Sequence, residues 1–119
     1  MKVYCISDIH GCLTEFEIAL SMVLEHLDKD DAKLVLLGDY IHGGADNREV
    51  LDRIISLQGK YGPDRVIALL GNHEELVLEG TSSINHMTNN VDKDQDDDMY
   101  ISWIGSLPRY HVEGNTIFV

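Results

Sequence analysis

KLVLLGD, residues 33–39, is the segment on which the fold depends, because four consecutive apolar residues end abruptly at Gly38-Asp39. A short apolar run that stops at turn residues is typical of a strand buried on both faces. Similar runs lie on either side of it, at Lys2 to Ile6 and at Arg65 to Leu70. Polar residues or glycine follow each run directly. The sequence therefore predicts three buried strands.

Amphipathic helical patterns separate these three runs. Thr14-x-x-Glu17 has the spacing of a capping box and opens the first helix. The apolar residues of this helix are Phe16, Leu20, Val23, Leu24 and Leu27. Asp46-x-x-Glu49 opens the second helix, whose apolar residues are Val50, Leu51, Ile54 and Ile55. Strands that alternate with helices predict an α/β fold, a mostly parallel sheet with βαβαβ units.

The rest of the chain is less regular. Gly71-Asn72-His73-Glu74 leads into a short helix, and the segment 80–98 is polar. A final helix is expected over 100–107, ending before Pro108. Residues 110–112 and 116–119 then resemble the strands of a hairpin across Glu113-Gly114-Asn115.

Composition limits the possible classes of protein. The chain has 119 residues and a formal net charge of −12, so we expect one domain and no nucleic-acid binding, which relies on Lys and Arg. No apolar run is long enough to span a membrane, and no secretory signal is apparent, so the expected location is cytoplasmic. Cys5 and Cys12 are interpreted as reduced thiols, the first in the core and the second in a turn.

An acidic run contributes −4 of the charge, from five aspartates and one lysine between Val91 and Met99. Asp92, Asp94 and Asp96 match the first, third and fifth positions of an EF-hand calcium loop. The sixth position is Asp97 instead of glycine, however, and the twelfth is Trp103 instead of glutamate. The pattern therefore fails as an EF-hand, and a solvated acidic loop is the better interpretation.

Five metal-binding or acid–base residues follow the three predicted strands: Asp8, His10, Asp39, Asn72 and His73. The carboxyl ends of parallel strands meet at one edge of a sheet, where sites form. Asp8 and His10 are two residues apart, and in an extended segment their side chains would point the same way. Such a cluster suits a hydrolase with two metals, in which a metal-activated hydroxide attacks a phosphoryl group and an imidazolium protonates the leaving oxygen. Taken singly, each residue could instead be a polar residue that caps a helix or turn.

Three motifs carry a family resemblance: Ser7-Asp8-Ile9-His10-Gly11, Gly38-Asp39-Tyr40 and Gly71-Asn72-His73-Glu74. In order and spacing they resemble the first three motifs of the calcineurin-like metallophosphoesterases, in the branch of serine/threonine phosphatases and diadenosine tetraphosphate hydrolases. The resemblance implies that Asp8 and His10 hold one metal, that Asp39 bridges and that Asn72 holds the second. It also implies that His73 is the general acid.

The same resemblance implies cofactors and substrates. Family members use two metal ions, from among manganese, iron and zinc. The implied substrate is a phosphoprotein, a dinucleoside polyphosphate or a small phosphoester, with a serine/threonine phosphatase-like activity favoured.

Two departures from the family pattern stand out. His42 and Gly43 occupy positions where this branch usually has an aspartate that supports the catalytic histidine and an arginine that grips phosphate. His42 could be a substitute ligand or acid, but a tolerated loop residue is the favoured interpretation. The spacing of His86 and His111 does not require a metal role.

The second departure concerns length. The family's last two metal-binding motifs would follow residue 119, so residues 1–119 are interpreted as the N-terminal part of a metallophosphoesterase domain. Weak or partial metal occupancy is therefore expected. Uncovered apolar surface would favour a homo-oligomer. The alternative function is a non-catalytic fragment that associates with itself or with a partner.

Overall fold

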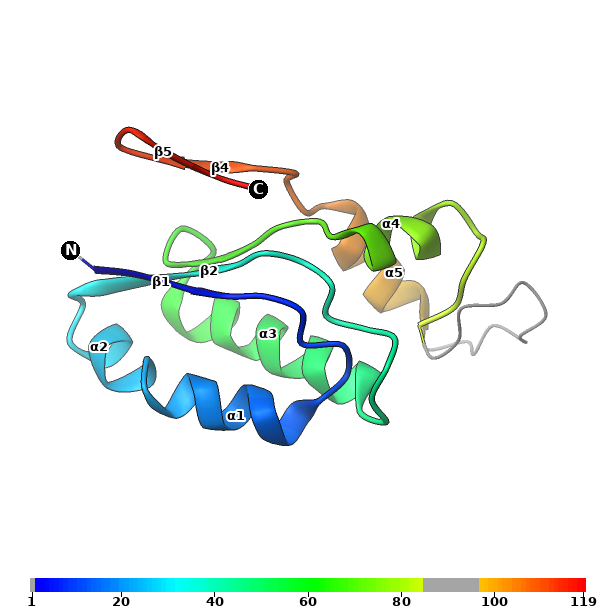
Figure 1. Cartoon of the computed structure of the whole chain (residues 1–119), viewed down its shortest axis with the longest axis horizontal. Helices are drawn as coiled ribbons and strands as arrows, with labels where there is room; N and C mark the ends of the chain where they lie inside the picture. The colour runs from blue at the N-terminus through cyan, green and yellow to red at the C-terminus, as the bar shows by residue number, and fades with distance from the viewer. Residues whose placement is uncertain (1, 85–96) are drawn as a thin grey trace.

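The computed structural model describes residues 2–84 and 97–119. Three parallel strands form its central sheet in the order β1-β2-β3: β1 (Lys2–Ile6), β2 (Ala32–Leu36) and β3 (Val66–Ala68). Ile6 pairs with Leu36, and Leu36 pairs with Ala68, so the carboxyl ends of the strands are level. The predicted α/β fold with βαβαβ units is confirmed (Figure 1).

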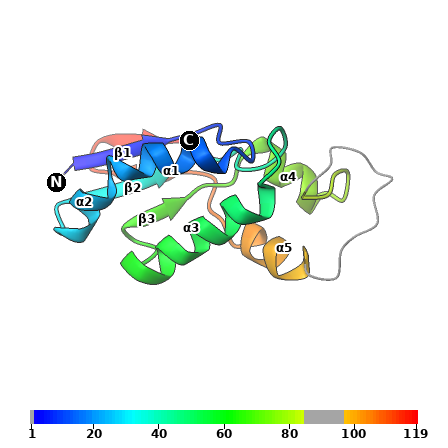
Figure 2. The same cartoon turned by 90° about the horizontal axis from the view of Figure 1, so that it is seen from below.

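Three helices cover one face of this sheet: α1 (Leu13–Ser21), α2 (Leu24–Asp28) and α3 (Asn47–Tyr61) (Figures 1 and 2). Leu34 and Leu36 of β2 face these helices and belong to the main core, together with Phe16 and Leu20 of α1. Val35 points to the opposite face, where it forms a small second cluster. This alternation along β2 explains why its whole sequence is apolar, since both faces of the strand are covered.

The first helix differs from its prediction in two ways. The predicted helix is divided into two helices, α1 and α2. Between them, Met22 N donates to Ala19 O and Val23 N donates to Leu20 O, each only three residues back, which makes a tight turn. This tight turn leaves Met22 71% exposed and still buries Val23. The expected capping box does not form either, because α1 already begins at Leu13 and no side chain caps it.

The second helix begins where expected, with Asp46 at the N-cap, although no side-chain bond from Asp46 caps it. Its core residues are Val50, Leu51, Ile54 and Leu57, while Ile55 is only partly buried.

The C-terminal part of the chain lies at two places around the sheet. Helices α4 (Asn72–Leu78) and α5 (Asp97–Gly105) pack together beside the ends of the strands. The predicted hairpin forms from β4 (His111–Glu113) and β5 (Thr116–Phe118), which pair antiparallel. It lies over the face of the sheet away from α1 and α3 (Figure 1). There Phe118 packs against the small cluster around Val35.

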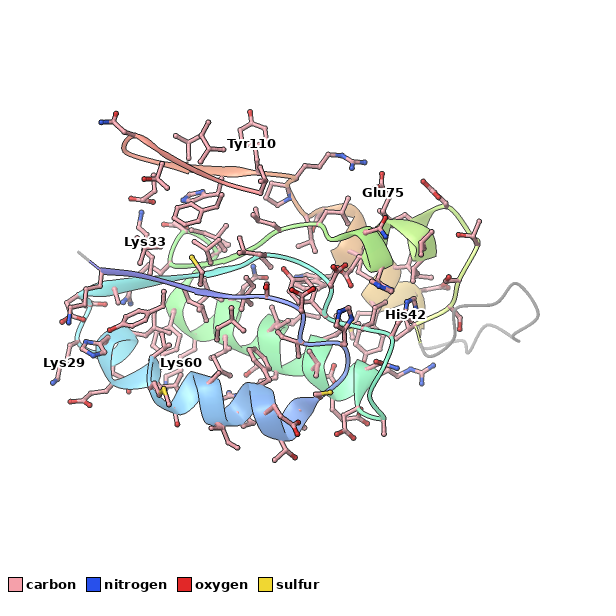
Figure 3. All side chains as sticks on the ribbon, in the orientation of Figure 1. Lys29, Lys33, His42, Lys60, Glu75 and Tyr110 are labelled. Atoms are coloured by element: carbon pink, nitrogen blue, oxygen red, sulfur yellow. The ribbon has the colours of Figure 1, made fainter. Side chains whose placement is uncertain are left out.

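Ion pairs hold the hairpin to the sheet. Lys33 on β2 donates to both carboxylate oxygens of Glu113, at 3.0 and 3.2 Å. His111 contacts the same carboxylate at 2.9 Å. Figure 3 shows Lys33 in the region between the sheet and the hairpin.

The acidic run lies mostly within residues 85–96, which are outside the described residues. His86 and the three aspartates of the rejected EF-hand pattern, Asp92, Asp94 and Asp96, lie there as well. Asp98 and Met99 belong to α5, so this end of the run is helical instead of a loop. Cys5 is exposed, contrary to its expected place in the core. It pairs with Val35 on the face of the sheet that carries the small cluster, and it lies outside that cluster. Among the described residues, no helix has the length and apolar character needed to cross a membrane.

Candidate metal centre

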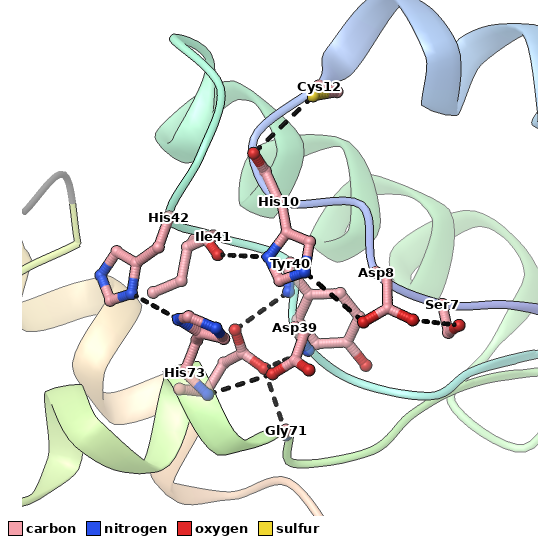
Figure 4. A network of polar contacts seen from close by, with 11 residues as sticks. Ser7, Asp8, His10, Cys12, Asp39, Tyr40, Ile41, His42, Gly71 and His73 are labelled. Atoms are coloured by element: carbon pink, nitrogen blue, oxygen red, sulfur yellow. Dashed lines mark hydrogen bonds and ion pairs between the residues drawn. The ribbon is translucent and has the colours of Figure 1, made fainter. Parts of the chain in front are cut away.

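The site lies where three loops meet at the carboxyl ends of the strands. The loop after β1 carries Asp8 and His10, the loop after β2 carries Asp39, and the first turn of α4 follows β3 (Figure 4). Main-chain bonds hold the first two loops together, from His10 N to Asp39 O at 3.0 Å and from Gly11 N to Tyr40 O at 2.8 Å. Side chains far apart in sequence are thereby brought to one edge of the sheet.

Close approach of the second and third loops depends on Gly71. A Cβ atom at this position would overlap the backbone nitrogen of Asp39. Glycine is therefore required here because it lets two main chains touch. The Gly-Asp and Gly-Asn-His sequences after β2 and β3 are thus parts of one contact.

Asp8, His10 and Asp39 form a compact group of metal-binding side chains. Their candidate ligand atoms all lie within 4.8 Å of one another, and His10 Nε2 is 3.4 Å from Asp8 Oδ1. His10 Nδ1 lies 3.2 Å from the carbonyl oxygen of Ile41, to which it donates when it carries the proton. That bond leaves the lone pair of Nε2 facing the two carboxylates, which is the usual way a second partner orients a metal-binding histidine.

The backbone reaches this arrangement through unusual conformations. Asp8, His10, Asp39 and His42 have φ angles of 55°, 49°, 58° and 71°, in the left-handed region that few residues other than glycine adopt. Asp8 and His10 therefore do not lie in an extended segment, and the prediction that they do is wrong. They meet because the loop turns, and such conformations concentrate at functional sites.

Glu74 organises the site, a role that was not predicted from the sequence. Its side chain is fully buried. One carboxylate oxygen accepts from the backbone nitrogens of Asp39 and Gly71, at 2.7 and 3.1 Å, and the other accepts from Tyr40 at 3.0 Å. Burial raises the pKa of Glu74, while these bonds oppose the rise. The available signal was its place three residues after Gly71, the N-cap of α4.

Asn72 and His73 occupy the first turn of α4. His73 donates its backbone N–H to Asp39 Oδ1 at 3.0 Å, and its ring packs edge-on against that of His10 with centroids 5.0 Å apart. His73 is thus part of the cluster. Asn72 is at the same edge of the sheet, with its side chain exposed at the start of the helix.

His42 lies in the loop between β2 and α3, as the favoured interpretation expects, but its side chain is buried and both ring nitrogens lie near hydrogen-bond partners. It is 5% exposed, and its Nδ1 lies 3.0 Å from His73 Nδ1. Its Nε2 lies 2.7 Å from the carbonyl oxygen of Ser83, and its backbone nitrogen donates to Asn47 Oδ1 at 3.0 Å. Burial lowers the pKa of His42 and so favours its neutral form. His111, by contrast, bonds to Glu113 in the hairpin.

Comparison with known proteins identifies relatives. The model of the calcineurin-like phosphoesterase family matches residues 1–119. A protein of Nitrosospira multiformis named symmetrical bis(5'-nucleosyl)-tetraphosphatase is 32% identical over 124 residues, covering 100% of this chain and 42% of its own. A protein of the same name from Buchnera aphidicola subsp. Baizongia pistaciae is 35% identical, covering 95% of this chain and 40% of its own. The chain therefore spans less than half the length of these relatives.

A solved structure supports the same fold. The crystal structure of a cold-active protein tyrosine phosphatase superposes with a TM-score of 0.50 and 25% sequence identity. The superposition covers 89% of this chain and 31% of the other.

Proposed function

The chain belongs to the calcineurin-like phosphoesterase family, and from this premise we propose that it contributes to a metal-dependent hydrolase of phosphate ester or anhydride bonds. We also propose that residues 1–119 form the N-terminal part of such a domain, since the named relatives are more than twice as long. The observation that carries the function is the convergence of Asp8, His10 and Asp39, with ligand atoms within 4.8 Å of one another.

The donor set fits a divalent transition metal. Two carboxylates and an imidazole nitrogen suit manganese, iron or zinc, and the Ile41 carbonyl orients His10 for this task. We assign Asp8 and His10 to one metal, Asp39 to a bridging position and Asn72 to a second metal. When bound, the metals supply Lewis-acid activation of the phosphoryl group and of water. Because only Asp39 and Asn72 are assigned to the second metal, its binding by this chain is expected to be weaker.

His73 is the residue best placed to move a proton. Its backbone bond to Asp39 and its ring contact with His10 keep the imidazole at the edge of the metal-binding group. An imidazole held there can donate a proton to the oxygen that leaves as the phosphate bond breaks. We therefore assign the role of general acid to His73.

Dinucleoside polyphosphates are the proposed substrate class. The two relatives described above are named for hydrolysis of a bis-nucleosyl tetraphosphate, and each aligns with nearly the whole of this chain. Phosphoproteins and small phosphomonoesters are the competing classes. They share the phosphoryl chemistry that the metal-binding residues serve, so substrate comparison must separate them.

Metal binding gives the direct test. Calorimetric titration with Mn²⁺ should show binding to the wild-type chain that Asp39→Asn abolishes. Asparagine is a suitable substitute, because it tolerates the left-handed backbone of position 39 and can still accept from His73 N–H. Asp64→Asn, at an exposed turn before β3, is the matched control and should bind as the wild type does. Equal binding by all three proteins would contradict the assignment.

Turnover tests the activity itself. In excess Mn²⁺, the chain should release product from diadenosine tetraphosphate, and Asp39→Asn should abolish that release. p-Nitrophenyl phosphate and a phosphopeptide, assayed in parallel, rank the substrate classes. Absence of turnover on every substrate would contradict hydrolysis by this chain, and undiminished turnover in Asp39→Asn would indicate a contaminating enzyme.

A further inference from the structure

Contacts from His73 to His42 and from His42 to Ser83 link the site to a segment whose sequence gives no functional signal. His42 lies between two partners. Its Nδ1 is 3.0 Å from His73 Nδ1 (Figure 4), and its Nε2 is 2.7 Å from the Ser83 carbonyl oxygen. Each of its ring nitrogens is therefore within hydrogen-bond distance of one group.

The position of the ring protons follows from these partners. A carbonyl oxygen can only accept, so the nitrogen of His42 that faces Ser83, Nε2, must carry a proton. Burial lowers the pKa of His42 and so favours the neutral ring at neutral pH, in which Nδ1 keeps a lone pair. Of two Nδ1 atoms 3.0 Å apart, the one on His73 must then donate.

The surroundings of His42 fix its ring in this orientation. The side chain is 5% exposed, and its backbone nitrogen is bonded to Asn47 at the start of α3. The segment that provides the Ser83 carbonyl is anchored as well, because Ser82 and Ile84 on either side are buried. The acceptor is thus held on a packed part of the chain instead of an exposed loop.

We propose that His42, held by the Ser83 carbonyl as its Nε2–H tautomer, positions His73 by accepting a hydrogen bond from His73 Nδ1–H. His73 then turns its Nε2 towards the reacting groups. His42 is a positioning residue, because it acts on the reaction only through its hydrogen bond with His73. This inference rests on the proposed function for the role of His73, but the hydrogen bond itself does not.

Nuclear magnetic resonance tests the hydrogen bond without metal or substrate. Long-range ¹H–¹⁵N spectra at neutral pH distinguish protonated from unprotonated ring nitrogens in each of the six histidines. We expect His42 to carry its proton on Nε2 and His73 to carry its proton on Nδ1. A wild-type chain in which His73 carries its proton on Nε2 would overturn the inference.

Two substitutions of similar side-chain volume distinguish the effect of the hydrogen-bond acceptor at position 42 from the effect of filling that space. His42→Asn places an amide oxygen where Nδ1 was, and asparagine tolerates the left-handed backbone of position 42. His42→Leu fills a similar volume and accepts nothing, but leucine is strained at a φ of 71°, so urea denaturation of both variants must first show that the fold is kept. We expect the Nδ1–H tautomer of His73 to persist in His42→Asn and to be lost in His42→Leu. The same His73 tautomer in both variants would also overturn the inference.

Kinetics give the second measurement. In His42→Leu, kcat should fall about 10- to 100-fold, which is part of the rate enhancement that a general acid usually provides. KM should stay unchanged. His42→Asn should retain most of the wild-type kcat. Equal losses in the two variants would contradict a role through hydrogen bonding. Lack of turnover in the wild type would instead contradict the proposed hydrolase and leave the spectroscopic result standing.

Discussion

At the scale of single residues, Glu74 is a buried carboxylate that holds the backbone of the site in place, although it is not assigned to a metal. It accepts hydrogen bonds from Asp39, Tyr40 and Gly71, which come from the loops after β2 and β3. Asp39 has a φ angle of 58°, and these bonds hold its backbone there. Loss of the acceptor would leave buried N–H groups unpaired, which costs free energy.

Glu74→Gln tests this role. Only one atom of the glutamine amide can accept, and its NH₂ group would face backbone N–H donors. We expect the free energy of unfolding to fall by about 1–3 kcal/mol, the usual cost of an unsatisfied buried group. Urea denaturation measures this change. Glu75→Gln is the matched control, since Glu75 pairs with an exposed Arg109 on the surface and should shift the midpoint little. Equal midpoints for the two variants would contradict the argument.

How far the sequence predicts this site depends on the kind of contact. Asp8, His10, Asp39 and His73 could be grouped because the ends of parallel strands meet at one edge. The role of His42 could not be read in the same way, because its partner is a backbone carbonyl 41 residues away and any residue type can supply one. Main-chain acceptors have no signature in a sequence.

At the scale of elements, helix boundaries depend on tertiary packing that periodicity does not contain. One helical pattern ran from Phe16 to Leu27, yet the chain turns at Met22 and Val23 and continues as α2. Both pieces still bury their apolar residues, Leu20 in the first and Leu27 in the second. The pattern therefore predicts correctly which residues are buried, but the prediction of one uninterrupted helix is wrong.

Helix α5 is docked on α3 by two polar contacts. Tyr100 donates its hydroxyl hydrogen to Asp52 at 2.8 Å, and the indole nitrogen of Trp103 donates to Gln58 at 3.0 Å. Burial and the neighbouring carboxylate raise the pKa of Tyr100 to about 12. The folded chain therefore favours the neutral phenol. Its contribution to stability is complete below pH 10 and is lost as pH rises through about 12.

Alkaline titration of tyrosine absorbance tests this contact. We expect Tyr100 to ionise at a pH near 12 in the wild type. Burial also raises the pKa of Tyr40 well above 10, so Tyr100→Phe should remove the share of one tyrosine from the late absorbance change instead of the whole change. Trp103 fluorescence should change over the same range, because α5 leaves α3. Tyr110→Phe, which alters a tyrosine 61% exposed on the hairpin side, is the control and should leave the late step in place. A late absorbance change that is undiminished in Tyr100→Phe would contradict the assignment.

The hairpin should respond to acid. Hydrogen bonds from His111 and Lys33 hold the pKa of Glu113 below its usual value of 4.5. A lowered pKa means that the stabilisation is present above 4.5 and is lost as pH falls below it. Methyl resonances of Val112 and Ile117 should therefore shift on acidification as the hairpin loosens. In Glu113→Gln this transition should disappear, and an unchanged transition would show that another group controls the hairpin.

At the scale of the whole molecule, the two faces of the sheet are covered unequally. The helices bury a large cluster on one face, whereas Val35, Ile67 and Leu69 form the buried part of a small cluster on the other. The candidate site lies on neither face but at the edge where the loops after all three strands meet. A ligand bound there would join segments that separate when the chain unfolds.

Metal binding should therefore stabilise the entire domain. The group formed by Asp8, His10 and Asp39 exists only in the folded chain, since the three residues span two loops more than 25 residues apart. Binding to the folded state alone adds about 2.7 kcal/mol to the free energy of unfolding when free metal is 100 times its Kd. Thermal unfolding with increasing Mn²⁺ should show a rising midpoint for the wild type and for Asp64→Asn, and a constant one for Asp39→Asn. A midpoint that rises equally in all three proteins would place the metal elsewhere on this acidic chain.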